Sequence, residues 1–221
     1  FNGLHGRSLP PSIGMRIANH KIKVIVESGD GCSYGEGGNH ILHNIRRNPD
    51  ITQLVHNNQI YGLTKGQASP TTAENLKTKV QPHGVNADPL NPIKFALSMG
   101  ASFVARGFVG KREHLSNLIK EAVNHRGYAL IDILQPCVSF NKVNTYRWYS
   151  ERVYEINDND KKDYNNALKL AEEWGDNIPI GVFYKKEREI FRDRFPQLDD
   201  IPLVEKKTEL QEMKNLMDEF K

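Results

Sequence analysis

Hydrophobic residues of this chain fall into short continuous runs that alternate with segments of helical spacing. Five runs predict buried strands at residues 21–28, 51–56, 102–106, 129–134 and 180–184. Between and around them, apolar residues three and four positions apart predict helices at residues 12–19, 39–47, 92–99, 112–124, 144–155 and 164–174. Strands that alternate with helices indicate an α/β fold, with a mostly parallel sheet and helices on both faces.

Two segments depart from this alternation. Residues 58–91 contain hardly any periodic apolar pattern but many Gly, Pro, Thr and Asn residues, and loops of this length are usually functional or disordered. Charged residues dominate after residue 184, and helical spacing returns at 205–221. We therefore expect an α/β domain at 1–184 and a charged extension at 185–221, whose amphipathic helix packs on the body or on a partner.

Polar residues follow two successive predicted strands. Gly29-Asp30-Gly31 comes at the end of the first strand, and Asn57-Asn58 follows the next one after 25 intervening residues. Because a short helix joins the two strands, they are expected to be parallel, with both carboxyl ends at one edge of the sheet. Ligands of open α/β sheets bind at that edge.

These residues offer the oxygen ligands that magnesium prefers. Asp30 supplies a carboxylate, Asn58 an amide oxygen, and Ile60 a backbone carbonyl two residues further on. A diphosphate would complete the metal shell, and the backbone amides at Gly31-Cys32 would favour its negative charge. The pattern predicts a metal-diphosphate site.

Composition narrows the class of protein. With 221 residues and a formal charge of +3 spread along the chain, there is no concentrated basic stripe for nucleic acid. No apolar stretch approaches the roughly 20 residues that cross a membrane. Two cysteines form no disulfide framework, so we expect a cytoplasmic protein. The chain opens at Phe1 within a Gly-rich loop, and we expect a segment upstream of it.

The spacing GDG-x25-NN resembles the metal-diphosphate signature of thiamine diphosphate enzymes, and the surrounding sequence narrows the resemblance. Several blocks, in order over residues 3–154, are similar to the β subunit of 2-oxoacid:ferredoxin oxidoreductases. They are GLHGRSLP (3–10), EGGNHILHNIRRNPD (36–50), NNQIYGLTKGQASPTT (57–72), QPCVSFN (135–141) and NTYRWYSERVY (144–154).

The resemblance implies a thiamine diphosphate-binding fold and a role for individual residues. The Mg²⁺ ligands would be Asp30, Asn58 and the carbonyl of Ile60. Positions that contact or line the cofactor would be His5, Gly31, Cys32, Gly62 and Leu63. Thr64 and Lys65 lie where the family recognises its acyl substrate or coenzyme A, and Cys137 matches one of four cysteines that bind a 4Fe-4S cluster.

The implied activity is oxidative decarboxylation of a 2-oxoacid to an acyl-CoA and carbon dioxide, with electrons passed to ferredoxin. An α-type subunit would supply the pyrimidine-binding domain, which has no counterpart in this length. The YGLTKGQ segment resembles enzymes that act on 2-oxoglutarate or on several 2-oxoacids, and Lys65 could pair with a distal carboxylate.

The chain also departs from the family. The other three cluster cysteines lie upstream of the HGR motif in the family, and aspartates often stand in place of Cys32 and Asn57. Single residues could also have no functional role: His5 and Lys65 would then be solvated side chains, and Cys137 a small apolar residue that fills space in the core. His40 and His43 lack a clear third zinc ligand. Two other functions stay open, a non-redox thiamine diphosphate decarboxylase or synthase, and a non-catalytic assembly subunit that retains the fold.

Overall fold

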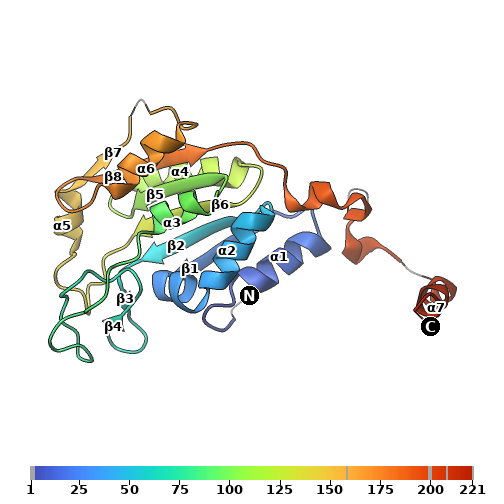
Figure 1. The fold of residues 1–221 in the computed structure, drawn as a ribbon, viewed down its shortest axis with the longest axis horizontal. Helices are drawn as coiled ribbons and strands as arrows, with labels where there is room; N and C mark the ends of the chain where they lie inside the picture. The colour runs from blue at the N-terminus through green and yellow to red at the C-terminus, as the bar shows by residue number, and fades with distance from the viewer. Residues whose placement is uncertain (1–2, 158, 199–200, 208, 221) are drawn as a thin grey trace.

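A mixed β-sheet lies at the centre of the computed structural model, which describes residues 3–157, 159–198, 201–207 and 209–220. Its six strands are β1 (Ile25–Gly29), β2 (Thr52–Asn57), β5 (Phe103–Phe108), β6 (Ala129–Leu134), β7 (Val153–Glu155) and β8 (Ile178–Lys185). Their order across the sheet is β1-β2-β6-β5-β8-β7 (Figure 1). Every neighbouring pair is parallel except β5 with β8. The predicted α/β fold with a mostly parallel sheet is confirmed.

Helices cover both faces of this sheet. One face carries α2 (Gly38–Arg47), α3 (Pro92–Ser98) and α6 (Tyr164–Glu172), with α1 (Leu9–Ala18) packed beside α2. The other face carries α4 (Arg112–Asn124). Side chains alternate along each strand, so Val104 of β5 joins the core of the first face while Phe103 and Ala105 join that of the second.

The observed boundaries follow the sequence pattern closely in the middle of the chain and less closely at its start. The ranges predicted for α4 and β6 coincide with the observed ones. Helix α1 begins before the predicted position because Pro10 and Pro11 occupy its first turn, where a missing N–H costs nothing. Ser12, predicted as the N-cap, lies inside the helix and donates its hydroxyl to the Ser8 carbonyl at 2.6 Å.

The prediction of one helix over residues 144–155 is wrong. Thr145 caps a short helix, α5 (Tyr146–Ser150), by accepting a hydrogen bond from the Trp148 N–H at 3.2 Å. The chain then extends into β7, which pairs with β8. The β-branched and aromatic residues Val153 and Tyr154 suit this edge strand, so sheet pairing prevails over helical spacing.

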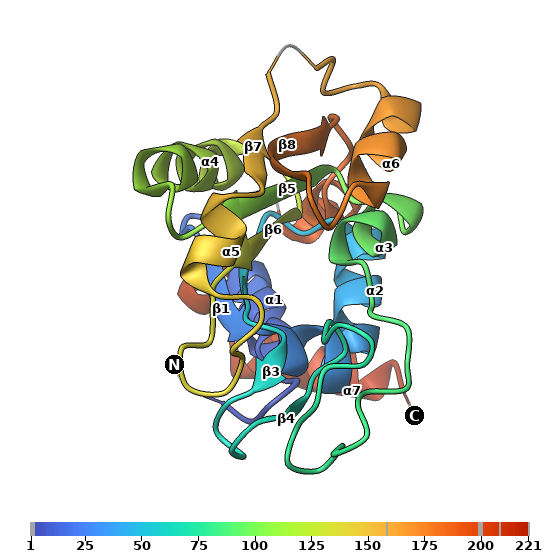
Figure 2. The ribbon, with the colours of Figure 1, turned by 90° about the vertical axis from the view of Figure 1, so that its left-hand side faces the viewer.

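Irregular segments gather at the edge where the parallel strands end (Figure 2). A π-helix, η1 (Gly31–Glu36), links β1 to α2. The predicted long loop at residues 58–91 contains a two-stranded hairpin, β3 (Ile60–Tyr61) with β4 (Gln67–Ala68). These segments meet on one side of the sheet, which makes that side the place to look for a site.

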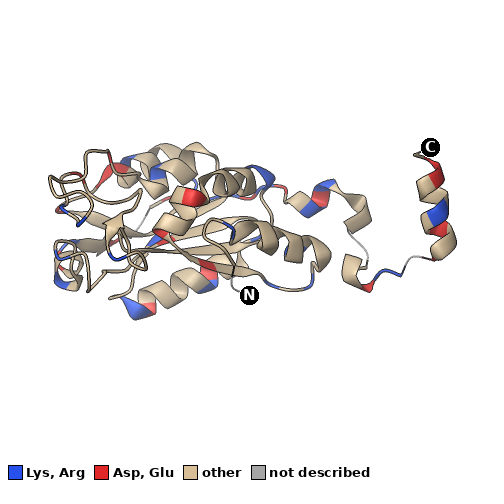
Figure 3. Ribbon diagram, turned by 90° about the horizontal axis from the view of Figure 1, so that it is seen from below, with Lys and Arg blue, Asp and Glu red and all other residues tan. Residues whose placement is uncertain are grey.

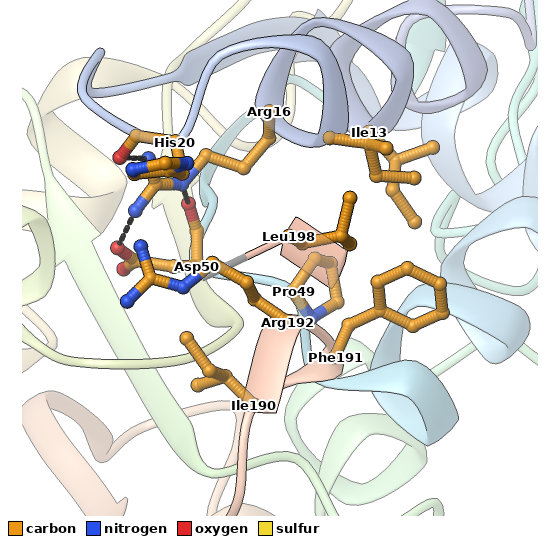
Figure 4. Close-up of a pocket in the computed structure, with 10 residues that line it drawn as sticks. Ile13, Arg16, His20, Pro49, Asp50, Ile190, Phe191, Arg192 and Leu198 are labelled. Atoms are coloured by element: carbon orange, nitrogen blue, oxygen red, sulfur yellow. Dashed lines mark hydrogen bonds and ion pairs between the residues drawn. The ribbon is translucent and has the colours of Figure 1, made fainter. Parts of the chain in front are cut away.

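The C-terminal extension is anchored at its beginning. It contains η2 (Phe191–Arg194), η3 (Pro196–Leu198), η4 (Leu203–Glu205) and α7 (Leu210–Asp218). Leu198 and Ile190 line one pocket with Ile13 of α1, and Figure 4 shows Leu198 near Ile13 and the ion pair of Arg16 with Asp50. Both Leu198 and Ile190 are buried. This first part of the extension therefore packs against the α/β domain.

Helix α7 lies away from the body (Figures 1 and 3). All of its described residues are exposed, so packing of this helix on the body, one of the two expected arrangements, is wrong. Residues 208 and 221 of the predicted helix lie outside the described part of the chain. Figure 3 also shows that charges of both signs are interspersed over the molecule. None of the described helices is long and apolar enough to cross a membrane.

The packing of α2 positions the loops on either side of it, and Ile45 anchors this helix. The Ile45 side chain is fully buried in the core of the first face. We expect Ile45→Ala to lower the free energy of unfolding by about 2–5 kcal/mol, because the change leaves a cavity. Ile22→Ala, at a position that is 41% exposed, should cost about 0.5 kcal/mol or less. Urea denaturation measures both, and equal losses would contradict this packing.

Candidate cofactor-binding site

The two polar motifs predicted from the sequence meet at the ends of neighbouring strands. Strand β1 pairs with β2 in parallel, with Gly29 opposite His56, so Asp30 and Asn58 both emerge at this edge. The Asp30 carboxylate accepts hydrogen bonds from the Ser69 hydroxyl at 2.5 Å and the Thr71 hydroxyl at 2.8 Å. It also accepts one from the backbone N–H of Asn58. The predicted juxtaposition of the two motifs is therefore present.

The Asp30 carboxylate is buried without a cationic partner. Only 1% of the residue is exposed, and burial raises the pKa of its carboxyl group, while the hydrogen bonds from Ser69, Thr71 and the Asn58 backbone act in the opposite direction. Within the described ranges, Asp30 has no ion pair with Lys, Arg or His. A carboxylate in this setting is costly unless a positive charge compensates it. The position therefore favours a cation.

A tight turn sets the geometry of the second motif. Gln59 has a positive φ of 62°, which reverses the chain directly after Asn58. The Asn58 side-chain oxygen accepts a hydrogen bond from the Ile60 N–H at 2.9 Å, and the Gln59 carbonyl accepts one from the Thr72 hydroxyl at 2.6 Å. The turn thus keeps the Asn58 amide next to the start of β3.

Small residues let the surrounding backbone approach η1 closely. A Cβ on Gly31 would lie 2.2 Å from the Tyr61 ring, so any larger residue there would require this ring to move. Gly6 has a φ of 72° and packs against Glu36, and its N–H donates to the Cys32 sulfur at 3.1 Å. The loop that carries the HGR motif is therefore fastened to the segment that follows Asp30.

The structure places the other predicted site residues around this centre without joining them to Asp30. His5 is exposed, in the loop whose Gly6 touches Cys32. Gly62, Leu63, Thr64 and Lys65 form the tip of the β3–β4 hairpin, and Leu63 is 84% exposed. The hydroxyl of Thr64 is hydrogen-bonded to Gln67 within the same tip. The base of this hairpin lies beside Asn58, whose side-chain oxygen accepts from the Ile60 N–H, and its tip projects from there.

Cys137 follows the end of β6 by three residues. The neighbouring Gln135 N–H donates to the Asn57 carbonyl at 2.9 Å, so this segment leaves the sheet beside the same edge. Both cysteines of the chain are free thiols. The described residues bring together no group of three or more His, Cys, Asp or Glu that could hold a metal ion. A four-iron cluster takes cysteine thiolates, so Cys137 would need ligands from outside this chain's described residues.

Sequence reasoning missed a buried polar network behind the site. The Asp132 carboxylate accepts hydrogen bonds from the Tyr34 hydroxyl at 2.9 Å and from the Asn57 amide at 3.1 and 3.2 Å. Arg106 lies opposite Asp132 in the strand register. Charged residues within the otherwise apolar runs ALIDIL and FVARGF were the available signal. Through Asn57 and Thr71, joined at 2.9 Å, this network reaches Asp30.

Burial dominates the ionisation of Asp132. Desolvation raises the pKa of its carboxyl group to about 6, although Arg106, Tyr34 and Asn57 oppose the shift. The folded protein therefore takes up a proton between about pH 4 and pH 6 that the unfolded chain does not. The contribution of Asp132 to stability is fully present below this window and is lost as the pH rises through it.

This linkage gives a testable pH dependence. We expect the free energy of unfolding of the wild type, minus that of Asp132→Asn, to fall as the pH rises from about 4.5 to 6.5 and then to level off. Urea denaturation at a series of pH values measures the difference. A difference that is independent of pH would show that Asp132 titrates normally.

With its mostly parallel sheet and its polar strand ends, the chain has the architecture of a thiamine diphosphate-binding domain. The family model described as "Thiamine pyrophosphate enzyme, C-terminal TPP binding domain" matches residues 1–133. A second family model, for the C-terminal part of the pyruvate ferredoxin oxidoreductase beta subunit, matches residues 137–200. The chain belongs to the family of 2-oxoacid:ferredoxin oxidoreductase β subunits, and the predicted family is confirmed.

Similar proteins support this membership. The chain is 44% identical over 197 residues to "2-oxoacid:ferredoxin oxidoreductase subunit beta" of Saccharolobus solfataricus, covering 83% of this chain and 64% of that one. It is 33% identical over 194 residues to "2-oxoglutarate synthase subunit KorB" of Archaeoglobus fulgidus, covering 88% and 70%. The chain thus spans about two-thirds of the length of such relatives.

A solved structure agrees with the fold. A 2-oxoglutarate:ferredoxin oxidoreductase from Magnetococcus marinus matches with a TM-score of 0.85 and 35% sequence identity, over 88% of this chain and 67% of that one. That protein was solved with 2-oxoglutarate, coenzyme A and succinyl-CoA bound.

Proposed function

We propose that this chain is the thiamine diphosphate-binding subunit of a 2-oxoacid:ferredoxin oxidoreductase. The observation that carries the proposal is the buried Asp30 carboxylate, which has no cationic partner among the described residues and lies against Asn58. Asp30, the Asn58 amide oxygen and the Ile60 carbonyl would bind Mg²⁺, which accepts few protein oxygens together with phosphate oxygens. One carboxylate and two neutral oxygens suit this ion better than zinc.

When bound, thiamine diphosphate supplies the nucleophilic carbon that releases carbon dioxide from a 2-oxoacid. The residues of this chain would hold and orient it. The backbone at Gly31 and Cys32 would face the diphosphate, with Tyr61 limiting the space on one side. His5, Gly62 and Leu63 would line the cofactor, since their loops flank η1 and the two residues Asp30 and Asn58.

The hairpin tip would recognise the substrate. Thr64 and Lys65 are exposed at the tip, where Lys65 has a φ of 72°. An ammonium group at this place would pair with the distal carboxylate of 2-oxoglutarate, which pyruvate lacks. The relatives that are named 2-oxoglutarate synthase subunits favour the same substrate. Coenzyme A would take the acyl group.

Turnover would need parts that this chain does not supply. An α-type subunit would bring the pyrimidine-binding domain, as the designation of several relatives as β subunits supports. Electrons would leave through a 4Fe-4S cluster with Cys137 as one ligand and pass to ferredoxin. Mg²⁺, the cluster and the acceptor are parts of the proposal, supported by family membership.

The metal ligands can be tested by cofactor binding. We expect Asp30→Asn and Asn58→Ala to weaken binding of thiamine diphosphate at fixed Mg²⁺ by at least about 100-fold, since loss of outer-shell groups alone costs about 10–100-fold. Isothermal titration calorimetry on the protein with its partner subunits measures this. Asp88→Asn, at an exposed position of the same long loop, is the matched control. Wild-type affinity in both ligand variants would refute the assignment.

Substrate choice can be tested at Lys65. We expect Lys65→Ala to lower the ratio of kcat/KM for 2-oxoglutarate to kcat/KM for pyruvate about tenfold, because the variant loses a charge pair made with only one substrate. Steady-state rates of the assembled enzyme give the ratio. Lys79→Ala, also exposed in the long loop, should leave it unchanged. An unchanged preference in Lys65→Ala would exclude this role.

A further inference from the structure

A separate cavity lies behind Asp30 and Asn58, the proposed metal ligands, on the face of the sheet covered by α3 and α6. Its volume is about 190 Å³, and neither Asp30 nor Asn58 lines it. Arg106, Asp132 and Gln59 form part of its polar wall, whereas Leu90 and Trp174 belong to its apolar wall. The space suits several water molecules or one small organic molecule.

Arg106 is short of hydrogen-bond partners in this cavity. Its side chain is 1% exposed and carries five N–H donors, yet its one hydrogen bond in the described structure is a long one, at 3.4 Å from Nη1 to the Pro179 carbonyl. Its Nε has no hydrogen-bond partner among the described residues. The Asp132 carboxylate is 4.0 Å away and accepts from Tyr34 and Asn57 instead.

The surroundings prepare the guanidinium for a planar ligand. The rings of Trp174 and Phe183 each lie 5.3 Å from its central carbon, which favours the charged form and restrains the group. Gln59 lines the same space, and its side-chain oxygen is also buried without a hydrogen-bond partner in the described part of the chain. Buried donors and acceptors are nearly always satisfied in native proteins, so this pair points to an occupant.

We propose that this cavity binds a small monocarboxylate, whose two oxygens accept hydrogen bonds from Arg106. A guanidinium matches a carboxylate in a bidentate geometry. The Asp132 carboxylate, 4.0 Å from Arg106, repels a phosphate dianion more strongly than a monoanion, so a monoanion is favoured. Leu90 and Trp174 would contact a short hydrocarbon part, and a hydroxyl group on the ligand would satisfy Gln59.

The cavity is distinct from the proposed cofactor site, but the two share one wall residue. Thr71 lines the cavity, and its hydroxyl donates to Asp30 on the other side. An occupant would therefore contact the residue that holds the Asp30 carboxylate. The proposal stands on Arg106 and the cavity, and does not depend on thiamine diphosphate binding.

Acetate and its neutral isostere acetamide test the proposal. The protein is purified with the subunits that accompany it, and each probe is titrated by calorimetry in a carboxylate-free buffer. We expect saturable binding of acetate and none of acetamide, because Arg106 recognises the charge. Crystals soaked in acetate should show it on the Arg106 guanidinium. Absence of saturable binding, density for water alone, or acetate bound only elsewhere would overturn the proposal.

Two variants separate binding from folding. Arg106→Met removes the charge, whereas Ala73→Leu keeps it and fills the cavity from its wall. Each should weaken acetate binding at least tenfold. Ala87→Leu, an exposed position in the same loop that does not line the cavity, should retain the affinity within twofold. If Ala73→Leu folds and binds acetate like the wild type, the cavity is not the site.

Discussion

Burial of the Asp30 carboxylate is the constraint on which this edge of the molecule depends. The parallel pairing of β1 with β2 brings the carboxylate to the Asn58 backbone, and Ser69 and Thr71 close over it with their hydroxyls. A buried anion must be compensated, and hydrogen bonds from neutral groups do so only in part. The long loop is ordered around this charge, so the fold of the loop and the chemistry of the site are inseparable.

A chain of polar contacts carries this arrangement into the sheet. Thr71 joins Asp30 to Asn57, and Asn57 donates to Asp132, which Tyr34 also supports. Networks of this kind inside a protein hold side chains in one arrangement when every member is satisfied. At one end of this network the Nε of Arg106 lacks a hydrogen-bond partner among the described residues, and the cavity lies beside it. At Asp30 a buried carboxylate without a cationic partner supports a cation, whereas at Arg106 a buried N–H donor without an acceptor in the described part of the chain supports an anion.

Much of this architecture follows from local patterns. The run ALIDIL and the amphipathic segment before it predicted β6 and α4 with their observed boundaries, because β6 is buried at every position and α4 buries one face only. The meeting of Asp30 with Asn58 followed from the parallel direction of two strands joined by a helix, which brings both carboxyl ends to one edge. The helix expected at 144–155 failed because Val153 and Tyr154 find a partner in β8, which local spacing does not encode.

The other residues of the site could not be predicted from the sequence, for a different reason. Ser69 and Thr71 lie in a loop without periodicity, and hydroxyls there indicate turns as readily as ligands. Arg106 and Asp132 stand on separate strands, so their pairing depends on sheet order, and β5 and β6 become neighbours only in the folded chain. The sequence shows a charged residue in each of these apolar runs, but it does not indicate that the two side chains lie close together.

The central claim is that Asp30 and Asn58 hold the metal of a bound diphosphate. Crystals of the assembled protein grown with thiamine diphosphate and Mn²⁺ in place of Mg²⁺ test it directly, because manganese is located by its anomalous scattering. The account predicts one strong peak about 2.1 Å from oxygens of Asp30, Asn58 and Ile60, near the distance typical of this coordination. A bound cofactor whose metal peak lies away from Asp30 would contradict it.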